Sequence, residues 1–515
     1  MTDLVCGALD RQHGLLEATR SWSAEDWLAW DDEVRVLGRW HSQALPSRRE
    51  LFGGSALGET ERLAVALCHP DGRVRERALG EVTTDSGLTP LVAVRSTDWA
   101  GPVRDRARAL LRDLLTAAEA VRYAGLLVRL GERARGEFGA GLLRELIGPD
   151  SVRPLLHDPD RQVRRHAHRL AVDRRWLDAR ASARRAAEDP DAVVQQLCAD
   201  AALRDVTEED ADEVLHALLG ARSARARSAG VTALRRLGRG ERAWDFLVDR
   251  NALVRACARY VVRQDGGDPR EFYAELCADP LSLEVPPGAV IGLAECGDRA
   301  DAGVLWACTG HEWDAVRASA VAGLRALDLA LPDRLLPLLD DESPKVVREV
   351  VAALLPDAAR LPGAWLAERL APGRERHTRV AAFRLLSARG GVPQLRVCVS
   401  LLENEDEDER LRRWAEQSVQ RWQPGREVPR GDAEVAALLT RSAHLFSGDA
   451  LRERRRAAGV PVESRDKGQE SQEKGQERQT EGRAEGQVEG QLEKRARTWG
   501  LRMGQGMRRL RRSRG

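Results

Sequence analysis

The sequence predicts an all-α fold, a right-handed α-solenoid of about 12 stacked antiparallel helix pairs followed by a disordered C-terminal tail. Three observations predict it. Apolar residues recur at spacings of three and four along most of the chain, which is typical of amphipathic helices. Strand-like alternation is nearly absent, and aromatic residues make up only 4% of the chain. A unit of about 31 residues repeats over most of the length, which is typical of stacked helical arrays.

Composition and charge narrow the class of protein. The chain has 515 residues, of which 43% are hydrophobic and 32% charged, so one long array can bury a core and keep a hydrated surface. The net charge is +1, so the chain as a whole is not a polycation that binds nucleic acid. Eight cysteines are scattered without a CxxC pair, and neither a basic leader nor a run of 18 apolar residues occurs. These features predict a cytoplasmic protein.

The repeated unit has the form Asp-x-x-Val-Arg-x-x-Ala, with a further apolar residue eight places after the Val. Its clearest copy consists of Asp160, Val163, Arg164, Ala167 and Ala171. The position of the Val, here termed the anchor, recurs at residues 74, 103, 134, 163, 194, 226, 254, 285, 316, 346, 378 and 411. The copies at 134 and 285 fit least well, because Phe138 and Pro286 break the pattern.

Each part of the unit has a physical reason. Asp, Asn or Ser three residues before the anchor suits a helix N-cap, which accepts a hydrogen bond from an unpaired backbone N–H. A preceding Asp-Pro or Ser-Pro pair, as at Asp158-Pro159, ends the previous helix and turns the chain. The anchor and the positions four and eight residues later share one helical face, and a small residue at the middle position lets helices approach closely. Each unit is therefore expected to be two antiparallel helices that must stack on their neighbours.

This unit resembles a HEAT repeat, in the short form of about 30 residues known from phycobilisome lyases and many bacterial proteins. The resemblance covers about residues 60–425. It implies that Asp and Arg of the second helix form a structural ladder between adjacent repeats, with the arginines Arg75, Arg104, Arg164, Arg227, Arg255, Arg317, Arg379 and Arg412. Gln195, Pro286 and Val347 interrupt this row, and we expect local softening or a change of curvature near them.

The two ends differ from the array in composition. The segment SAEDWLAWDDEVRVLGRW begins with Ser23 and Asp26 in capping-box spacing, followed by Trp27, Trp30 and Val34 at helical spacing. We expect an N-terminal helical cap at 1–55, a HEAT-like solenoid at 56–430, a C-terminal helical cap at 431–458, a low-complexity Glu/Gln/Gly linker at 459–493 and a basic tail at 494–515.

The basic tail has nine basic residues and no acidic one. Trp499, Met503, Met507 and Leu510 fall at helical spacing within it. Such a segment is compatible with a solvated tail that pairs with the acidic residues upstream, with nucleic-acid phosphates, or with an anionic membrane or another acidic partner. The tail residues singled out as candidate contacts are Lys494, Arg495, Arg497, Arg502, Arg508, Arg509, Arg511 and Arg512.

The sequence shows no constellation typical of catalysis, of a cofactor or of a metal. HExxH, CxxC, the P-loop pattern and GxSxG are all missing, and no small-molecule substrate is evident. His166 and His168 are two residues apart on a predicted helix, so their side chains diverge and do not suit a zinc site. The residues predicted to face a partner from the inner surface are Arg106, Arg108, Arg165, His168 and Arg169.

These observations favour a non-enzymatic protein–protein interaction scaffold, or adaptor, that binds a protein or peptide on the curved inner surface of the solenoid. The alternative is a nucleic-acid-binding protein that uses the basic C-terminal tail, in the extreme case one resembling the HEAT-like alkylpurine DNA glycosylases. A third hypothesis, the chromophore-lyase branch of short HEAT proteins, rests on likeness of fold only.

Overall fold

The computed structural model describes Leu15, Glu17 and residues 19–40, 51–52, 58–404 and 408–461. The secondary structure of this part is helical, and no strand occurs in it. The described part of the chain divides into two compact units, with the boundary between Ala226 and Arg227. Within the described ranges, none of the helices combines the length and apolarity that a membrane span needs.

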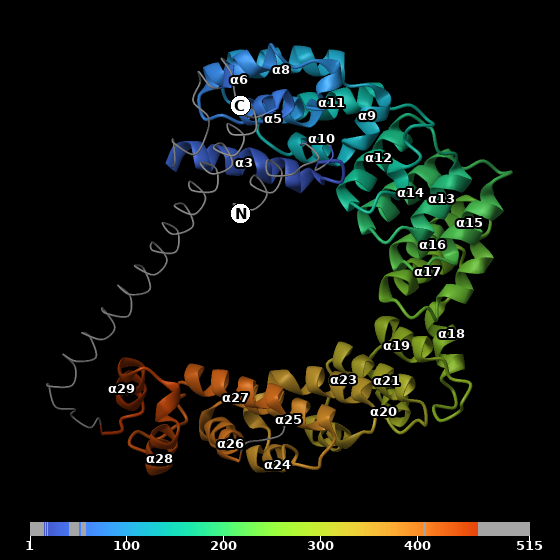
Figure 1. Ribbon diagram of the computed structural model, residues 1–515. Helices are drawn as coiled ribbons and strands as arrows, with labels where there is room; N and C mark the ends of the chain where they lie inside the picture. The colour runs from blue at the N-terminus through green and yellow to red at the C-terminus, as the bar shows by residue number, and fades with distance from the viewer. Residues whose placement is uncertain are drawn as a thin grey trace, which may run out of the picture. The chain divides into compact units, whose positions relative to one another are not determined.

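The first unit is a succession of helix pairs in chain order (Figure 1). Its pairs are α5 (Glu59–Leu67) with α6 (Gly72–Leu79), α7 (Thr89–Arg95) with α8 (Gly101–Leu114), α9 (Ala117–Arg122) and α10 (Ala124–Gly131) with α11 (Glu137–Leu146), a 3₁₀ turn (Leu155–His157) with α12 (Arg161–Asp173), and α13 (Ala179–Glu188) with α14 (Ala192–Asp205). Then α15 (Ala211–Leu219) leads to α16 (Ala224–Arg236), which runs across the boundary between the units.

The second unit continues the same arrangement. Its pairs are a 3₁₀ turn (Gly240–Phe246) with α17 (Ala252–Gln264), α18 (Pro269–Leu276) with α19 (Pro287–Cys296), α20 (Ala302–Cys308) with α21 (Asp314–Ala326), α22 (Pro332–Leu335) with α23 (Pro344–Leu354), α24 (Gly363–Glu368) with α25 (Arg376–Arg389), and α26 (Gly391–Glu403) with α27 (Glu409–Arg421). Further 3₁₀ turns lie at Arg299–Asp301, Leu336–Asp340 and Leu355–Arg360. The prediction of about twelve helix pairs is confirmed, although 3₁₀ turns replace the first helix of two pairs.

The second helix of most pairs forms where the repeat frame predicts it. Asp71, Asp160 and Asn251 cap their helices by accepting the backbone N–H two residues later, at 2.9, 2.8 and 3.0 Å. The anchors and the small residues four places later are buried, as shown by Val316 and Ala320, both 0% exposed. The capping and packing roles inferred from the sequence are confirmed at these positions.

Stacking joins the second helices of successive pairs. In the first unit α6 contacts α8 and α12 contacts α14, and in the second unit α19, α21, α23, α25 and α27 contact one another in order. The small residue four places after the anchor, present on most of the second helices, permits this close approach. Each pair therefore buries on its neighbours the apolar faces that it cannot cover alone.

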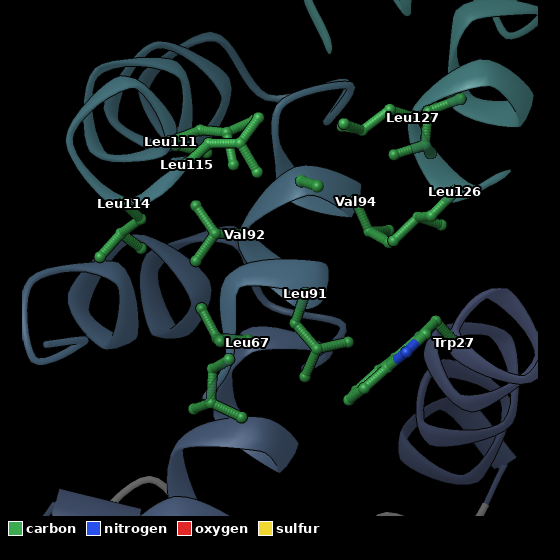
Figure 2. Close-up of a cluster of buried hydrophobic side chains, with 14 of the residues drawn as sticks. Trp27, Leu67, Leu91, Val92, Val94, Leu111, Leu114, Leu115, Leu126 and Leu127 are labelled. Atoms are coloured by element: carbon green, nitrogen blue, oxygen red, sulfur yellow. The ribbon is translucent and has the colours of Figure 1, made fainter. Parts of the chain in front are cut away.

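The core of the first unit begins at helix α3 (Ala24–Trp40), which packs against α7 and α10. Ser23 and Asp26 form the predicted capping contacts, with Ser23 N donating to Asp26 Oδ2 at 2.8 Å and Asp26 N to Ser23 Oγ at 3.2 Å. Trp27 lies beside Leu91 of α7, within the cluster of leucines and valines in Figure 2. An ion pair between Arg95 of α7 and Asp31 of α3 also joins these two helices.

The second unit ends in α28 (Ala433–Arg441), a 3₁₀ turn at Ala443–Leu445 and α29 (Gly448–Ala457). Val435, Leu438 and Leu439 of α28 join the core of this unit. The predicted linker, except for residues 459–461, and the whole basic tail lie outside the described residues.

Two anchors were predicted wrongly. Ala134 lies exposed in a turn, and α11 begins only at Glu137, because the extra helix α9 lengthens this repeat. Val285 is buried but precedes α19, because a connection of ten residues (Cys277–Pro286) separates α18 from α19. Pro287, at the first position of α19, sets the actual start of that helix.

Candidate binding surface

The arginine that follows the anchor organises the contact between neighbouring repeats in several places. In the clearest case, Nε and Nη2 of Arg317 donate to the carboxylate of Asp341, at 2.8 and 2.9 Å. Its Nη1 donates to the carbonyl oxygens of His311 and Glu312, at 2.9 and 2.7 Å. One guanidinium therefore joins the turn before its own helix to the turn of the next repeat.

The carboxylate in each such contact has a second role. Asp341 accepts the backbone N–H of Ser343 at 2.8 Å, so it also shapes the turn that leads into α23. The same arrangement holds at Arg75 with Asp98, Arg164 with Asp189 and Arg227 with Asp249, whose carboxylates accept the N–H of Ala100, Asp191 and Asn251. We refer to these four arginine–aspartate contacts as the rungs.

The other arginines of the predicted row have different partners. Arg104 donates to the carbonyl of Asp98 at 3.1 Å, and Arg379 to that of Leu370 at 3.0 Å. Arg255 pairs with Glu295, which lies on α19 rather than in a turn. Arg412 is half-buried on α27 and has no carboxylate partner in the described part of the chain.

Gln195 replaces the arginine in the fifth repeat and keeps part of its geometry. Its Nε2 donates to the carbonyl of Asp189 at 2.7 Å, and its Oε1 accepts from Ser223 Oγ at 2.6 Å. In this repeat, neutral hydrogen bonds of Gln195 therefore replace the charged contact between arginine and aspartate. Val347 is buried among apolar residues, and Pro286 precedes its helix. Softening at these three repeats stays a prediction.

Of the five residues predicted to face a partner, two are exposed and two are engaged within the array. Arg106 and Arg169 are exposed on α8 and α12. Arg108 donates to the carbonyls of Ser96 and Arg135, at 3.1 and 2.9 Å, and so joins two repeats. Arg165 makes a bidentate pair with Asp191, the N-cap of α14, at 2.9 and 2.7 Å.

The prediction that His168 faces a partner is wrong. The side chain is fully buried, and its Nδ1 lies 2.9 Å from the carbonyl oxygen of Arg164. Burial lowers the pKa of His168, which favours the neutral imidazole. The repeat pattern predicts which face of a helix packs against its own repeat. It does not predict which further side chains the neighbouring repeat covers, so the burial of His168 was missed.

The sequence did not reveal a hollow that lies between α6 and α8. Its volume is about 550 Å³, and it is lined by Arg73, Glu76, Arg77, Gly80, Glu81 and Arg106. The guanidinium of Arg106 lies against Gly80, where a Cβ would be only 2.5 Å from Nη2. Glu81 is paired with Arg62 at 2.9 Å, whereas Arg73 and Arg106 have no side-chain partner among the described residues. The hollow therefore offers two guanidinium groups to a ligand.

Other reactive groups in the described ranges are not arranged as a site. No cluster of three or more His, Cys, Asp or Glu side chains that could hold a metal ion occurs there. The seven cysteines within the described ranges are free, and burial raises the pKa of Cys198 and Cys277 to about 12, which favours the unreactive thiol.

The rung between Arg317 and Asp341 predicts that substitution of Asp341 strongly destabilises the folded protein. Substitution D341A leaves the nearly buried guanidinium of Arg317 without its carboxylate, so we expect a loss of about 3–5 kcal/mol in the free energy of unfolding. Glu342 provides the matched control, because it lies 3.8 Å from the same guanidinium but is 90% exposed. We expect E342A to change stability by less than about 0.5 kcal/mol in chemical denaturation. Equal effects of the two substitutions would contradict the rung as a stabilising contact.

The pair of Arg165 with Asp191 predicts sensitivity to acid. Hydrogen bonds from Arg165 are the main cause that lowers the pKa of Asp191 from 3.8 to about 2. The folded state therefore favours the charged carboxylate, and this stabilisation is complete above pH 3.8 and is lost as the pH falls through about 2.

We expect D191N, which keeps a capping side chain, to destabilise the protein by about 1–2 kcal/mol at neutral pH and to flatten the loss of stability between pH 4 and 2. Asp178 caps α13 by accepting only a backbone N–H, so D178N should leave that slope unchanged. Denaturation midpoints over a pH series test this. A slope in D191N as steep as in the parent protein would refute the assignment.

Comparisons with known proteins find likeness in structure only. No protein-family model matches the sequence, and no curated protein matches it. The yeast importin-β Kap95p, solved with RanGDP, is similar with 12% identity and a TM-score of 0.40, over 88% of this chain and 72% of that one. YibA of Escherichia coli is similar with 16% identity and a TM-score of 0.25, over 56% of this chain and 98% of that one. The stacked helix pairs are therefore established by the helices of this chain and the contacts between them.

Proposed function

We propose that the protein is a non-enzymatic scaffold that binds a protein or peptide partner on the exposed faces of its second helices. The observation that carries this proposal is the hollow between α6 and α8. Within the part of the chain that the structure describes, Arg73 and Arg106 have no side-chain partner, while comparable arginines such as Arg75 and Arg165 are held in structural pairs. Guanidinium groups bind carboxylates and phosphates in bidentate geometry. We therefore propose that the partner segment bound in this hollow is acidic.

Two further assignments belong to this proposal. The free thiols of the described cysteines support a reducing, cytoplasmic location. The repeat length near 31 residues supports the short HEAT type known from phycobilisome lyases. That likeness concerns the fold, and we propose no lyase activity from it.

Reversal of charge in the hollow tests the scaffold function. We expect R73E/R106E to weaken capture of the acidic partner at least tenfold, because the two guanidinium groups would become repulsive carboxylates. The measurement is quantitative affinity enrichment from cells that express the full chain at its native level. R153E is the control, since Arg153 is 78% exposed and outside the hollow. Recovery of no partner by the parent protein, or equal recovery by R73E/R106E, would contradict the proposal.

Nucleic-acid binding is the second candidate function, favoured by the composition of residues 494–515. Neutralisation of phosphates by arginines makes affinity fall steeply with salt. We expect the full chain to shift a labelled DNA duplex in a gel at low salt, and a chain lacking 494–515 to lose this shift. R73E/R106E should keep it. If the shortened chain shifts DNA equally well, the tail is not the binding element.

A further inference from the structure

Large apolar side chains are exposed on two consecutive turns of the second unit. Leu281 and Leu283 lie on the connection between α18 and α19 and are 59% and 50% exposed. Trp313 is the N-cap of α21 and is 47% exposed. We refer to these three side chains as the apolar edge. Such a concentration of exposed apolar surface is typical of an interaction site.

One buried histidine holds the two turns together. Nε2 of His311 lies 2.9 Å from the carbonyl oxygen of Ser282, and its Nδ1 accepts the backbone N–H of Trp313 at 2.8 Å. The imidazole is 1% exposed, and its ring centroid is 6.1 Å from that of Trp313. Arg317 fixes the carbonyl of His311 in turn, at 2.9 Å. The apolar edge is therefore presented on a frame that the array itself positions.

The two segments that carry the apolar edge are acidic. Residues 277–298 and 300–316 contain no Lys or Arg, although the whole chain has 82 of them. Asp279, Glu284 and Glu312 are exposed and form no ion pair within the described ranges. The other carboxylates of these segments include Glu295, Asp298 and Asp314, which pair with Arg255, Arg270 and Lys345. Exposed carboxylates without an ion pair therefore lie on the same two segments as the apolar side chains.

An irregular repeat leaves Asp279 available. In a regular rung, such as Arg227 with Asp249, the carboxylate of the next turn is bound by the preceding arginine. Here the connection before α19 is longer, and Arg255 pairs with Glu295 on the helix instead. The turn that would complete a rung is therefore open to a partner.

We propose that the apolar edge and its three carboxylates form a docking surface for a basic peptide segment of a partner protein, in which apolar side chains alternate with Lys or Arg. Charge complementarity selects this occupant, because exposed carboxylates attract cations and repel acidic segments. An aromatic ring at the centre of such a surface commonly contributes most of the affinity. This inference rests on the proposed scaffold function and deepens it. It adds a second surface, which binds a basic segment, whereas the hollow between α6 and α8 binds an acidic one.

The probe for this surface is a fluorescein-labelled amphipathic peptide made of Leu and Lys, titrated against the full chain and followed by anisotropy. We expect W313A and E284K/E312K each to weaken binding about tenfold. The matched controls L331S and D333K alter an exposed apolar and an exposed acidic residue of a neighbouring repeat, and should change affinity less than twofold. Circular dichroism checks that each variant keeps its helical content. E284K/E312K changes only exposed side chains, so it preserves the test if W313A fails to fold.

Two further variants separate the alternatives. R73E/R106E should leave binding of the peptide unchanged, so failure of the acidic-partner proposal and failure of this one are distinguishable. Binding that strengthens when Arg508, Arg509, Arg511 and Arg512 are changed to Gln would show that the chain's own tail occupies the surface, which overturns the assignment to a separate partner. Equal affinity of the parent protein, W313A and E284K/E312K would overturn the docking surface itself.

Discussion

The array depends on a carboxylate that is shared between a turn and a distant arginine. Asp341 accepts the backbone N–H of Ser343, two residues away, and the guanidinium of Arg317, 24 residues away. The hydrogen bond from Ser343 shapes the turn, and the hydrogen bond from Arg317 holds the preceding repeat against that turn. Because both bonds use one nearly buried side chain, the conformation of the turn and the stacking of successive repeats are coupled at each rung.

This coupling also decides which charges remain for recognition. An arginine in a rung has its donors satisfied by one carboxylate and by carbonyl oxygens, so it cannot bind a ligand without leaving the array. The charges that remain available lie outside the rungs. Arg106 lies one face away from the rungs, against Gly80, and Asp279 lies in a turn whose rung is rerouted to Glu295. Charged residues outside the rungs are therefore better guides to binding than the residues of the rungs.

The sequence predicted what local chemistry determines. Caps such as Asp160 and buried pairs such as Val163 with Ala167 were predicted correctly, because backbone capping and helical periodicity act within a few residues. Predictions failed where a neighbouring repeat decides the outcome. The burial of His168 depends on what packs over it, and the actual start of α19 depends on an insertion that shifts the frame. For the same reason, the hollow beside Arg106 has no signature in a single repeat.

The two proposed surfaces differ in how they obtain affinity. The hollow between α6 and α8 is polar, so its attraction for an acidic segment is electrostatic. Added salt shortens the Debye length and thereby weakens this attraction. The apolar edge combines exposed carboxylates with the large side chains of Leu281 and Trp313, whose burial does not require charge. Salt therefore weakens the first contact more than the second. A scaffold with two such surfaces can distinguish its partners by the sign of their charge and by the apolar anchors that accompany it.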